Sequence, residues 1–169
     1  QALLFMCVGA AVTATGKERL SELGGLARHM PWTAACCVVA GAAISSLPFT
    51  AAFLTKSLIL SAVAKEGLQG TWFLLLAGAA ATVIHSGIRV PYHVFFGPDR
   101  GFAASQTRAG PRLAMAAAAL GLIIIGLLPG AFYALLPGGI SYQAYTLGHV
   151  ITQLQLVLFA ALAYTLLLR

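Results

Sequence analysis

The sequence has few charged residues and very few acidic ones. Charged side chains make up 8% of the 169 residues and only four are Asp or Glu, whereas 60% of the residues are hydrophobic. A soluble domain normally has about a quarter charged residues, so this composition excludes an ordinary soluble protein. The mean hydropathy of +0.91 is typical of a polytopic membrane protein.

Motifs for redox, hydrolytic and metal chemistry are also missing. The three cysteines, Cys7, Cys36 and Cys37, lie in apolar runs without metal-site spacing, and adjacent cysteines on a helix cannot readily bridge each other. We expect them to be packing residues. The sequence has no phosphate-binding glycine loop and no paired nucleophile and base. We therefore predict no catalytic site, no cofactor and no metal in this chain. The net charge of +6 has no accompanying aromatic pattern, so we predict contact with a lipid bilayer and not with nucleic acid.

The apolar residues fall into five runs, which predict an all-α bundle of transmembrane helices. About 20 apolar residues cross a bilayer core of about 30 Å, so the last three runs fit one helix each, and the first resembles the tail of a longer span. Because apolar segments lie at both ends of the sequence, we interpret it as an internal piece of a longer protein, forming a single membrane domain. The runs are 2–14, 32–64, 72–96, 113–136 and 150–168.

The long run 32–64 predicts a discontinuous helix. Its 33 or so residues would make a rod of roughly 50 Å, too long for one straight crossing and short for two. Pro48 has no N–H and its ring clashes with the carbonyl of Ile44, so the first half should end near Leu47. Thr55 would then cap a second half-helix that begins at Lys56. We predict a break near 48–55.

Loop charges favour one interrupted crossing over a hairpin that crosses twice. Loops 16–29 and 97–112 each have three Lys or Arg residues, loop 65–70 has one, and loop 137–149 has none. If the long run crosses once, both basic loops lie on one side, which should be the cytoplasm; a hairpin would separate them. We predict a single crossing, with loops 16–29 and 97–112 cytoplasmic.

Lys56 is the only charged residue between Met30 and Ala64. An ionisable residue inside a membrane is by default a functional hypothesis. Burial and the dipole of the second half-helix both disfavour its charged form, so we predict that this lysine exchanges a proton instead of holding it permanently. The alternative is a lysine that extends to the membrane interface near a re-entrant turn.

The run 72–96 contains a second polar feature. His85, Arg89 and His93 follow at i, i+4 and i+8, which places them on one face of an α-helix. Histidine releases its proton near neutral pH, so this stripe could link the bilayer centre to the cytoplasm. Alternatively, Arg89 and His93 are interfacial anchors and His85 is a packing residue. Pro91 should kink the end of this helix.

The last run begins with polar residues of another kind. His149, Gln153 and Gln155 lie near its start, a pattern that predicts interhelical hydrogen bonds more than a site for a conducted ion.

Several motifs together resemble a known family. Ala-Leu-Leu-Phe-Met at 2–6, Leu-Gly-Gly-Leu-Ala-Arg-His-Met-Pro-Trp-Thr at 23–33, Leu47-Pro48 and Phe-Leu-Thr-Lys at 53–56 resemble the C-terminal half of the antiporter-like proton-translocating subunits. These are the large membrane subunits of respiratory complex I, of membrane-bound hydrogenases and of the Mrp cation/proton antiporters. Ile-Arg-Val-Pro-Tyr at 88–92, followed by Phe-Phe-Gly, is most similar to the bacterial Mrp-like D subunits.

The resemblance implies a fold of two inverted repeats, each with one broken helix, of which this chain would hold most of the second. It also implies that Lys56 is a key proton-transfer residue and that His85 matches a histidine often present on the next helix. Ala52 and Thr55 stand where the family usually has Gly and Ser. Gln1 stands where a lysine commonly precedes the first motif, so that lysine's role is not transferred to this chain.

The leading hypothesis is proton translocation by one subunit of a multi-subunit complex in the bacterial inner membrane. Protons would pass through Lys56 and His85, with Arg89 and His93 as further candidates for the pathway, alone or in exchange for Na⁺ or K⁺. The partners would be the other membrane subunits of an antiporter or complex I-like assembly. Whether an NADH-quinone oxidoreductase-like or hydrogenase-like enzyme is attached stays open. Two alternatives are a self-sufficient secondary transporter for a small solute and a structural membrane anchor, which would tolerate Lys56→Leu.

Overall fold

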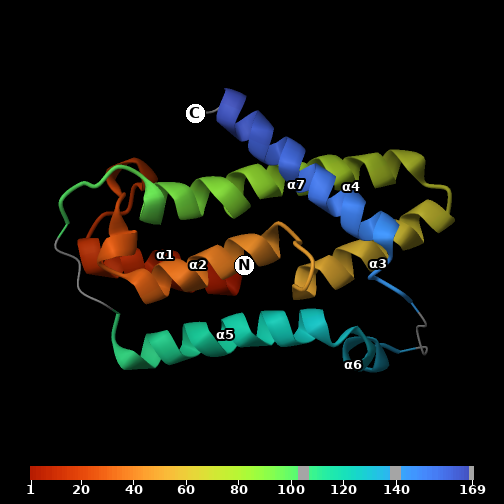
Figure 1. The fold of residues 1–169 in the computed structure, drawn as a ribbon, viewed down its shortest axis with the longest axis horizontal. Coiled ribbons are helices and arrows are strands. Elements are labelled where there is room, and N and C mark those ends of the chain that lie inside the picture. Colours follow the sequence, from red (N-terminus) through yellow and green to blue (C-terminus); the bar gives the residue numbers. More distant parts are fainter. Residues whose placement is uncertain (103–106, 138–141, 168–169) are drawn as a thin grey trace. The chain divides into compact units, whose positions relative to one another are not determined.

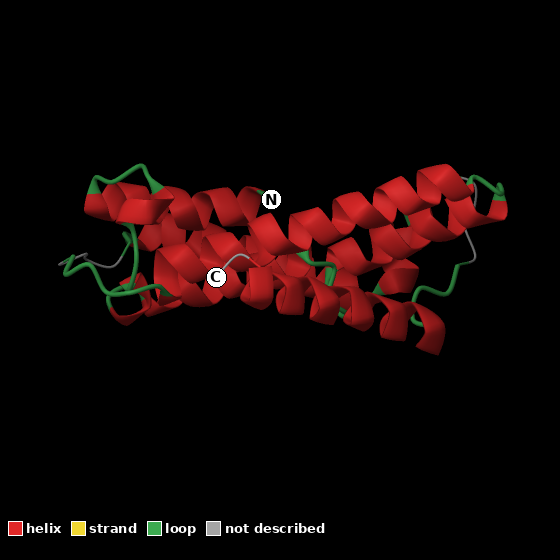
Figure 2. Cartoon of the chain, turned by 90° about the horizontal axis from the view of Figure 1, so that it is seen from above, coloured by secondary structure: helices red, strands yellow, loops and turns green. Residues whose placement is uncertain are grey.

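A computed structural model describes residues 1–102, 107–137 and 142–167 of the chain. Within these ranges the regular secondary structure is entirely helical, with no strand (Figure 1, Figure 2). Three described helices are long and apolar enough to cross a membrane: Gln69–Phe96, Ala109–Leu127 and Leu147–Leu166. The predicted fold class, a polytopic helical membrane bundle, is confirmed.

The elements follow one another along the chain as labelled in Figure 1. They are α1 (Ala2–Thr15), the short 3₁₀ helices η1 (Leu20–Glu22) and η2 (Leu26–Arg28), α2 (Pro31–Ile44), α3 (Ala51–Lys65), α4 (Gln69–Thr82), the π-helical segments η3 (Val83–Arg89) and η4 (Tyr92–Phe96), α5 (Ala109–Leu127), α6 (Pro129–Ala134) and α7 (Leu147–Leu167).

Two of the predicted helices differ from expectation. The run 113–136 does not form one helix, because α5 ends at Leu127 and Pro129 starts the separate helix α6. Proline lacks the N–H that a continuous helix would need, but it fits the first turn of a new one. The run 72–96 is α-helical only as far as Thr82 and then winds as a π-helix.

The chain divides into two compact units. Unit 1 consists of residues 1–42 and 85–120, and unit 2 of residues 43–84 and 121–169. In unit 1 the three cysteines are free and buried, as predicted for packing residues, and the thiol of Cys7 donates to the sulfur of Met115 at 3.7 Å.

A close helix contact accounts for one glycine of unit 1. Gly41 of α2 lies so near the backbone of η3 that a Cβ atom would come within 2.7 Å of the Gly87 carbonyl oxygen. The ring of Pro91 lies next to the same position, 3.2 Å from that Cβ. Small residues allow such backbone approach between helices in lipid. The contact therefore fixes α2 against the π-helical segment.

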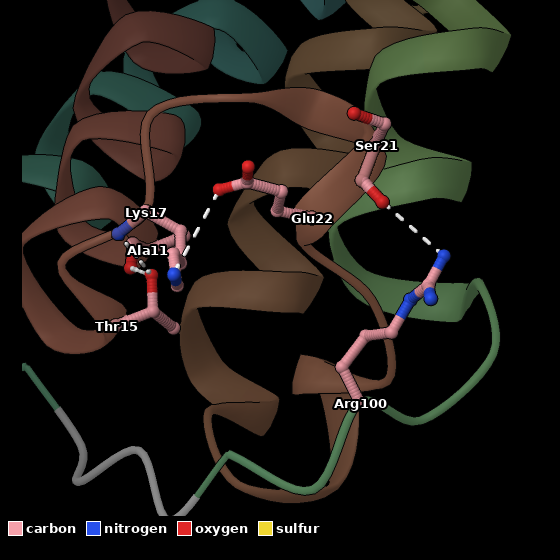
Figure 3. Close-up of polar contacts among 6 residues, drawn as sticks. All are labelled: Ala11, Thr15, Lys17, Ser21, Glu22 and Arg100. Carbon is pink, nitrogen blue, oxygen red and sulfur yellow. Dashed lines mark hydrogen bonds and ion pairs between the residues drawn. The ribbon is translucent and has the colours of Figure 1, made fainter.

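The two basic loops of unit 1 pack against each other. Gly24 and Gly25 have positive φ angles, and Cβ atoms there would lie 2.3 Å from the Pro98 carbonyl oxygen and 2.6 Å from the Asp99 Cα. Figure 3 shows Arg100 donating to the carbonyl of Ser21, at 3.2 Å. These contacts support the prediction that loops 16–29 and 97–112 lie on the same side of the membrane, as a single interrupted crossing requires. Their cytoplasmic location stays a prediction.

Unit 2 contains Lys56, the lysine that the sequence places on the broken helix. In this unit α3 packs against α4, and α4 packs against α7. Its buried apolar cluster contains Phe53, Leu54, Tyr133 and Ala144. The ring of Tyr145 stacks on Phe53, with 5.2 Å between ring centroids. This packing anchors the first turn of α3 and so positions the residues that follow it.

Candidate functional site

The chain leaves the helical conformation between α2 and α3, at residues 45–50, and Pro48 lies within this break. Ser46 and Phe49 have φ angles of 53° and 69°. This left-handed region is uncommon for residues other than glycine, and such backbone persists only where surrounding contacts hold it. The break is therefore a defined backbone conformation held by surrounding contacts, and not a frayed helix end.

The predicted capping role of Thr55 is wrong. Helix α3 begins at Ala51 with Thr50 as its N-cap residue, so Thr55 lies inside the helix, where its hydroxyl donates to the Ala52 carbonyl at 3.2 Å. The chain resumes the helix earlier than expected because Thr50 closes a turn directly after Pro48, its hydroxyl donating to the Leu47 carbonyl at 2.7 Å. Lys56 is thus in the second turn, where the helix dipole acts less strongly than at the first.

Contacts from α5 and from Tyr145, which lies just before α7, hold the break in place. The carbonyl of Phe49 lies directly against Gly126, where a Cβ atom would come within 2.3 Å of that oxygen. The ring of Phe49 stacks on Tyr145 at 5.7 Å, and the hydroxyl of Tyr145 donates to the Gly126 carbonyl. These contacts explain how two non-glycine residues keep positive φ angles.

Lys56 is half-buried and reaches toward α7. Its Nζ donates to Oε1 of Gln153 at 2.8 Å. The same amide donates from Nε2 to the carbonyl of Ser45 at 2.7 Å, and the Gln153 side chain is buried. Carbonyls at a helix end lack an intrahelical partner. Gln153 therefore satisfies an orphan carbonyl of the break and binds the lysine at the same time.

The partner of Lys56 is neutral. The four acidic residues are Glu18, Glu22, Glu66 and Asp99, and the described part of the chain has a single ion pair, Lys17 with Glu22 at 4.0 Å. An amide oxygen accepts a hydrogen bond from an ammonium and from a neutral amine alike. The contact with Gln153 thus positions Lys56 without fixing its protonation state.

Lys56 also lines two cavities. One, of about 220 Å³, lies among α3, α4 and α7, and its polar lining includes Ser57, Ser61, His149 and Thr152. The other, of about 460 Å³, lies next to the break and between α3 and α4, where Ser46, Thr55, Gly78 and Thr82 line it. A water molecule occupies about 30 Å³ in the liquid, so each cavity has room for several. We call them the His149 cavity and the Thr82 cavity.

His85, Arg89 and His93 lie in the π-helical part of unit 1. The side chains of His85 and Arg89 are exposed on the unit, and His93 is half-buried, with Tyr92 edge-on at 5.4 Å. The prediction that these three side chains share one face assumed an α-helix. The segment that contains them is π-helical and has more residues per turn. Short π-helical segments are frequent at functional sites. Since Lys56 belongs to unit 2, the predicted relay between Lys56 and His85 stays a prediction.

A second polar cluster joins α3, the segment before α7 and His149 of α7, and the sequence did not predict its partners. The hydroxyls of Ser61 and Tyr142 lie 2.7 Å apart, and Nε2 of His149 lies 3.3 Å from the Ser61 hydroxyl. Nδ1 of His149 lies 3.2 Å from the Ala144 carbonyl oxygen. The expectation of interhelical hydrogen bonds is confirmed for His149 and Gln153, whereas Gln155 is exposed. In the sequence, these contacts were indicated only by two polar residues within an apolar run. Their hydrogen-bond partners could not be identified because they are distant in the sequence.

The broken helix, its half-buried lysine and the long apolar helices define a polytopic membrane protein with an ionisable site within the bundle. Residues 1–85, which include Lys56, match the family described as "NADH:quinone oxidoreductase/Mrp antiporter, TM". The chain belongs to this family, so the resemblance predicted from the motifs is confirmed at the family level.

Individual relatives are more distant and much longer. The chain is similar to NADH-ubiquinone oxidoreductase chain 5 of Bos indicus, with 32% identity over 103 residues, and of Dugong dugon, with 29% identity over 103 residues. Its identity to the Aedes aegypti protein is 34% over 99 residues. These matches cover 57–59% of this chain but 17% of each relative.

Proposed function

We propose that this chain is part of a proton-translocating membrane subunit in which Lys56 takes up and releases the transported proton. The proposal rests on one observation: a half-buried lysine, bound by a neutral amide, lines two separate cavities. A lysine with a merely structural role would need neither water-sized space on two sides nor a partner that tolerates both of its charge states. Membership in the NADH:quinone oxidoreductase/Mrp antiporter family supports the same function.

In this mechanism the protein positions the lysine and the cavities supply its proton path. A charged group inside the bundle is costly, so the ammonium of Lys56 gives up its proton readily once water in one cavity can accept it. The amine then takes a proton from the other cavity. Gln153 stays bound throughout, because its amide oxygen accepts from both forms of the lysine. No covalent chemistry is needed.

The Thr82 cavity is the proposed entrance from the cytoplasmic side. Thr82 ends α4 and lines the cavity, and His85 follows it three residues later in the same continuous helical stretch. His85 would exchange protons with this cavity, and Arg89 and His93 would extend the path toward loop 97–112. Histidine suits this role because its proton is mobile near neutral pH.

The assembly is proposed from the family and the motifs together. The subunit would work with other membrane subunits in an antiporter or complex I-like complex. The stretch at 88–92 and the Phe-Phe-Gly after it favour a bacterial Mrp-like D subunit, resident in the inner membrane and exchanging protons for Na⁺ or K⁺.

Proton flux into vesicles that contain the full-length complex tests the proposal. Lys56→Ala and Lys56→Arg should both assemble and lose flux, because arginine keeps its charge and does not release its proton. Lys65→Ala is the matched control, since Lys65 is an exposed lysine at the end of the same helix, and its flux should equal that of the wild type. Normal flux in both Lys56 variants would show that the lysine is not on the pathway. Flux by the isolated subunit would instead indicate a self-sufficient transporter.

A further inference from the structure

The His149 cavity leads away from Lys56 toward a polar cluster that has no assigned role. Ser61 lies five residues after Lys56 on α3, about 7.5 Å farther along the helix axis. His149 lies four residues before Gln153 on α7, so the two side chains share a face of that helix. The pairs Lys56 with Gln153 and Ser61 with His149 therefore join α3 to α7 at two successive levels. The same cavity touches all four residues.

The hydrogen bonds determine the proton positions in the cluster. Because the Ala144 carbonyl can only accept, Nδ1 of His149 is the donor in that contact and bears the proton of the neutral ring. Nε2 is then an acceptor for the Ser61 hydroxyl. Ser61 in turn accepts from Tyr142, whose hydroxyl lies at 2.7 Å. The unprotonated ring nitrogen is thus the one that Ser61 links to the cavity.

We infer that His149, with Ser61 and Tyr142, is the proton relay between Lys56 and the non-cytoplasmic side of the membrane. This inference rests on the proposed function and on the predicted sidedness of the loops. In the predicted topology, α5 crosses the membrane once between the basic loop 97–112 and loop 137–149, so Tyr142 and His149 would lie on the side opposite the basic loops. In that topology the cluster would lie at the side of the membrane where protons are released.

The transfer balances at each step. Lys56 gives a proton to water in the His149 cavity and becomes a neutral amine. The water passes a proton to the Ser61 hydroxyl, whose own proton moves to Nε2 of His149, and the ring becomes an imidazolium. Nδ1 then gives its proton to the hydroxyl of Tyr142, 3.4 Å away, and Tyr142 releases its own proton to the solvent. The Nε2 proton returns to Nδ1 by exchange through the hydroxyls of Ser61 and Tyr142, which contact the two ring nitrogens and each other, so the first tautomer is restored and one proton has moved outward.

A purely structural role for His149 would be a bond between α3 and α7. Glutamine can keep such a bond but cannot exchange a proton, so His149→Gln separates the two roles. The matched control is His29→Gln, the same change at an exposed loop histidine. In vesicles with the full-length complex we expect His149→Gln to assemble and to reduce proton flux by about a hundredfold or more. We expect His29→Gln to transport like the wild type.

Chemical rescue provides a second readout that a structural bond would not affect. Imidazole added to His149→Ala should restore part of the lost flux, because it can occupy the vacated space and exchange protons there. Tyr142→Phe and Ser61→Ala remove only hydroxyl groups and should each reduce flux severalfold. If His149→Gln does not assemble, these two variants decide, and normal flux in both would overturn the inference.

The outcomes also separate this inference from the proposed function. Loss of flux in Lys56→Ala together with normal flux in His149→Gln would overturn the His149 relay and leave Lys56 as the proton carrier. Normal flux in Lys56→Ala would overturn both. Flux that falls in His149→Ala and is not restored by imidazole would show that His149 acts only as a structural contact.

Discussion

The ammonium of Lys56 and the side-chain amide of Gln153 are joined by a hydrogen bond of 2.8 Å between Nζ and Oε1. The amide nitrogen of Gln153 simultaneously holds the carbonyl of Ser45, at the end of α2. One side chain of α7 thus couples the position of the lysine to the geometry of the helix break. A change at Gln153 should therefore affect both stability and transport.

Gln153→Leu should lower both. Leucine leaves the Ser45 carbonyl and the Lys56 ammonium without their partner, and an unsatisfied buried polar group costs about 1–3 kcal/mol. Thermal unfolding of the full-length subunit in detergent measures the loss, and vesicle flux measures the effect on transport. Gln155→Leu is the control because Gln155 is exposed on the same helix. Equal effects of the two substitutions would contradict a bridging role for Gln153.

Gln153→Glu should affect transport without comparable damage to assembly. A carboxylate next to Lys56 favours the charged form of the lysine and retains its proton. Proton flux in vesicles should therefore fall, while the amount of assembled complex stays near that of the wild type. An assembled Gln153→Glu complex with undiminished flux would mean that Lys56 need not become neutral.

The sequence was sufficient to predict the break and its lysine because both signals are local. Pro48 removes a helical N–H, and Lys56 is the only charge in a long apolar stretch. The position of the cap was predicted five residues too late because Thr50 and Thr55 are both suitable caps. The structure chooses Thr50, whose backbone is extended and whose hydroxyl closes the turn with Leu47.

The partners of the lysine could not be predicted in the same way. Gln153 lies 97 residues from Lys56 in the sequence, and Ser61 lies 88 residues from His149. Such pairs depend on how α3 packs against α7, and an isolated polar residue on an apolar helix does not indicate which helix it faces. The π-helical winding after Thr82 has no local sequence signal of comparable strength either.

Gly126→Ala tests the contact that supports the break. Its Cβ would lie 2.3 Å from the carbonyl oxygen of Phe49, which is backbone and cannot simply rotate away. Overpacking of this kind costs about 1–3 kcal/mol, so the thermal unfolding temperature and the proton flux should both fall. Gly121→Ala is the control in the same helix, because nothing lies within 4 Å of its Cβ. A loss of the same size in both variants would point to a general effect of alanine in α5.

Gly25→Ala tests the contact between the two basic loops. Gly25 and Gly16 both have a φ of 68°, so alanine imposes a similar conformational cost at either position. Only at Gly25 would the new Cβ also approach the Asp99 Cα, at 2.6 Å, whereas nothing lies within 4 Å at Gly16. Gly25→Ala should therefore lower the free energy of unfolding by about 1–3 kcal/mol more than Gly16→Ala does. Equal losses would mean that the loops separate without cost.

The sidedness of the loops can be measured with cysteines introduced at exposed positions. Ser21, Asp99 and Gln143 are exposed, whereas Cys7, Cys36 and Cys37 are buried and should react slowly. With an impermeant maleimide applied to oriented vesicles, Ser21→Cys and Asp99→Cys should label from the cytoplasmic side and Gln143→Cys from the other. A hairpin in the long apolar run would instead place Ser21 and Asp99 on opposite sides. Labelling of Gln143→Cys from the cytoplasm would show that His149 lies near the side where protons are taken up. It would then not belong to the proposed release path.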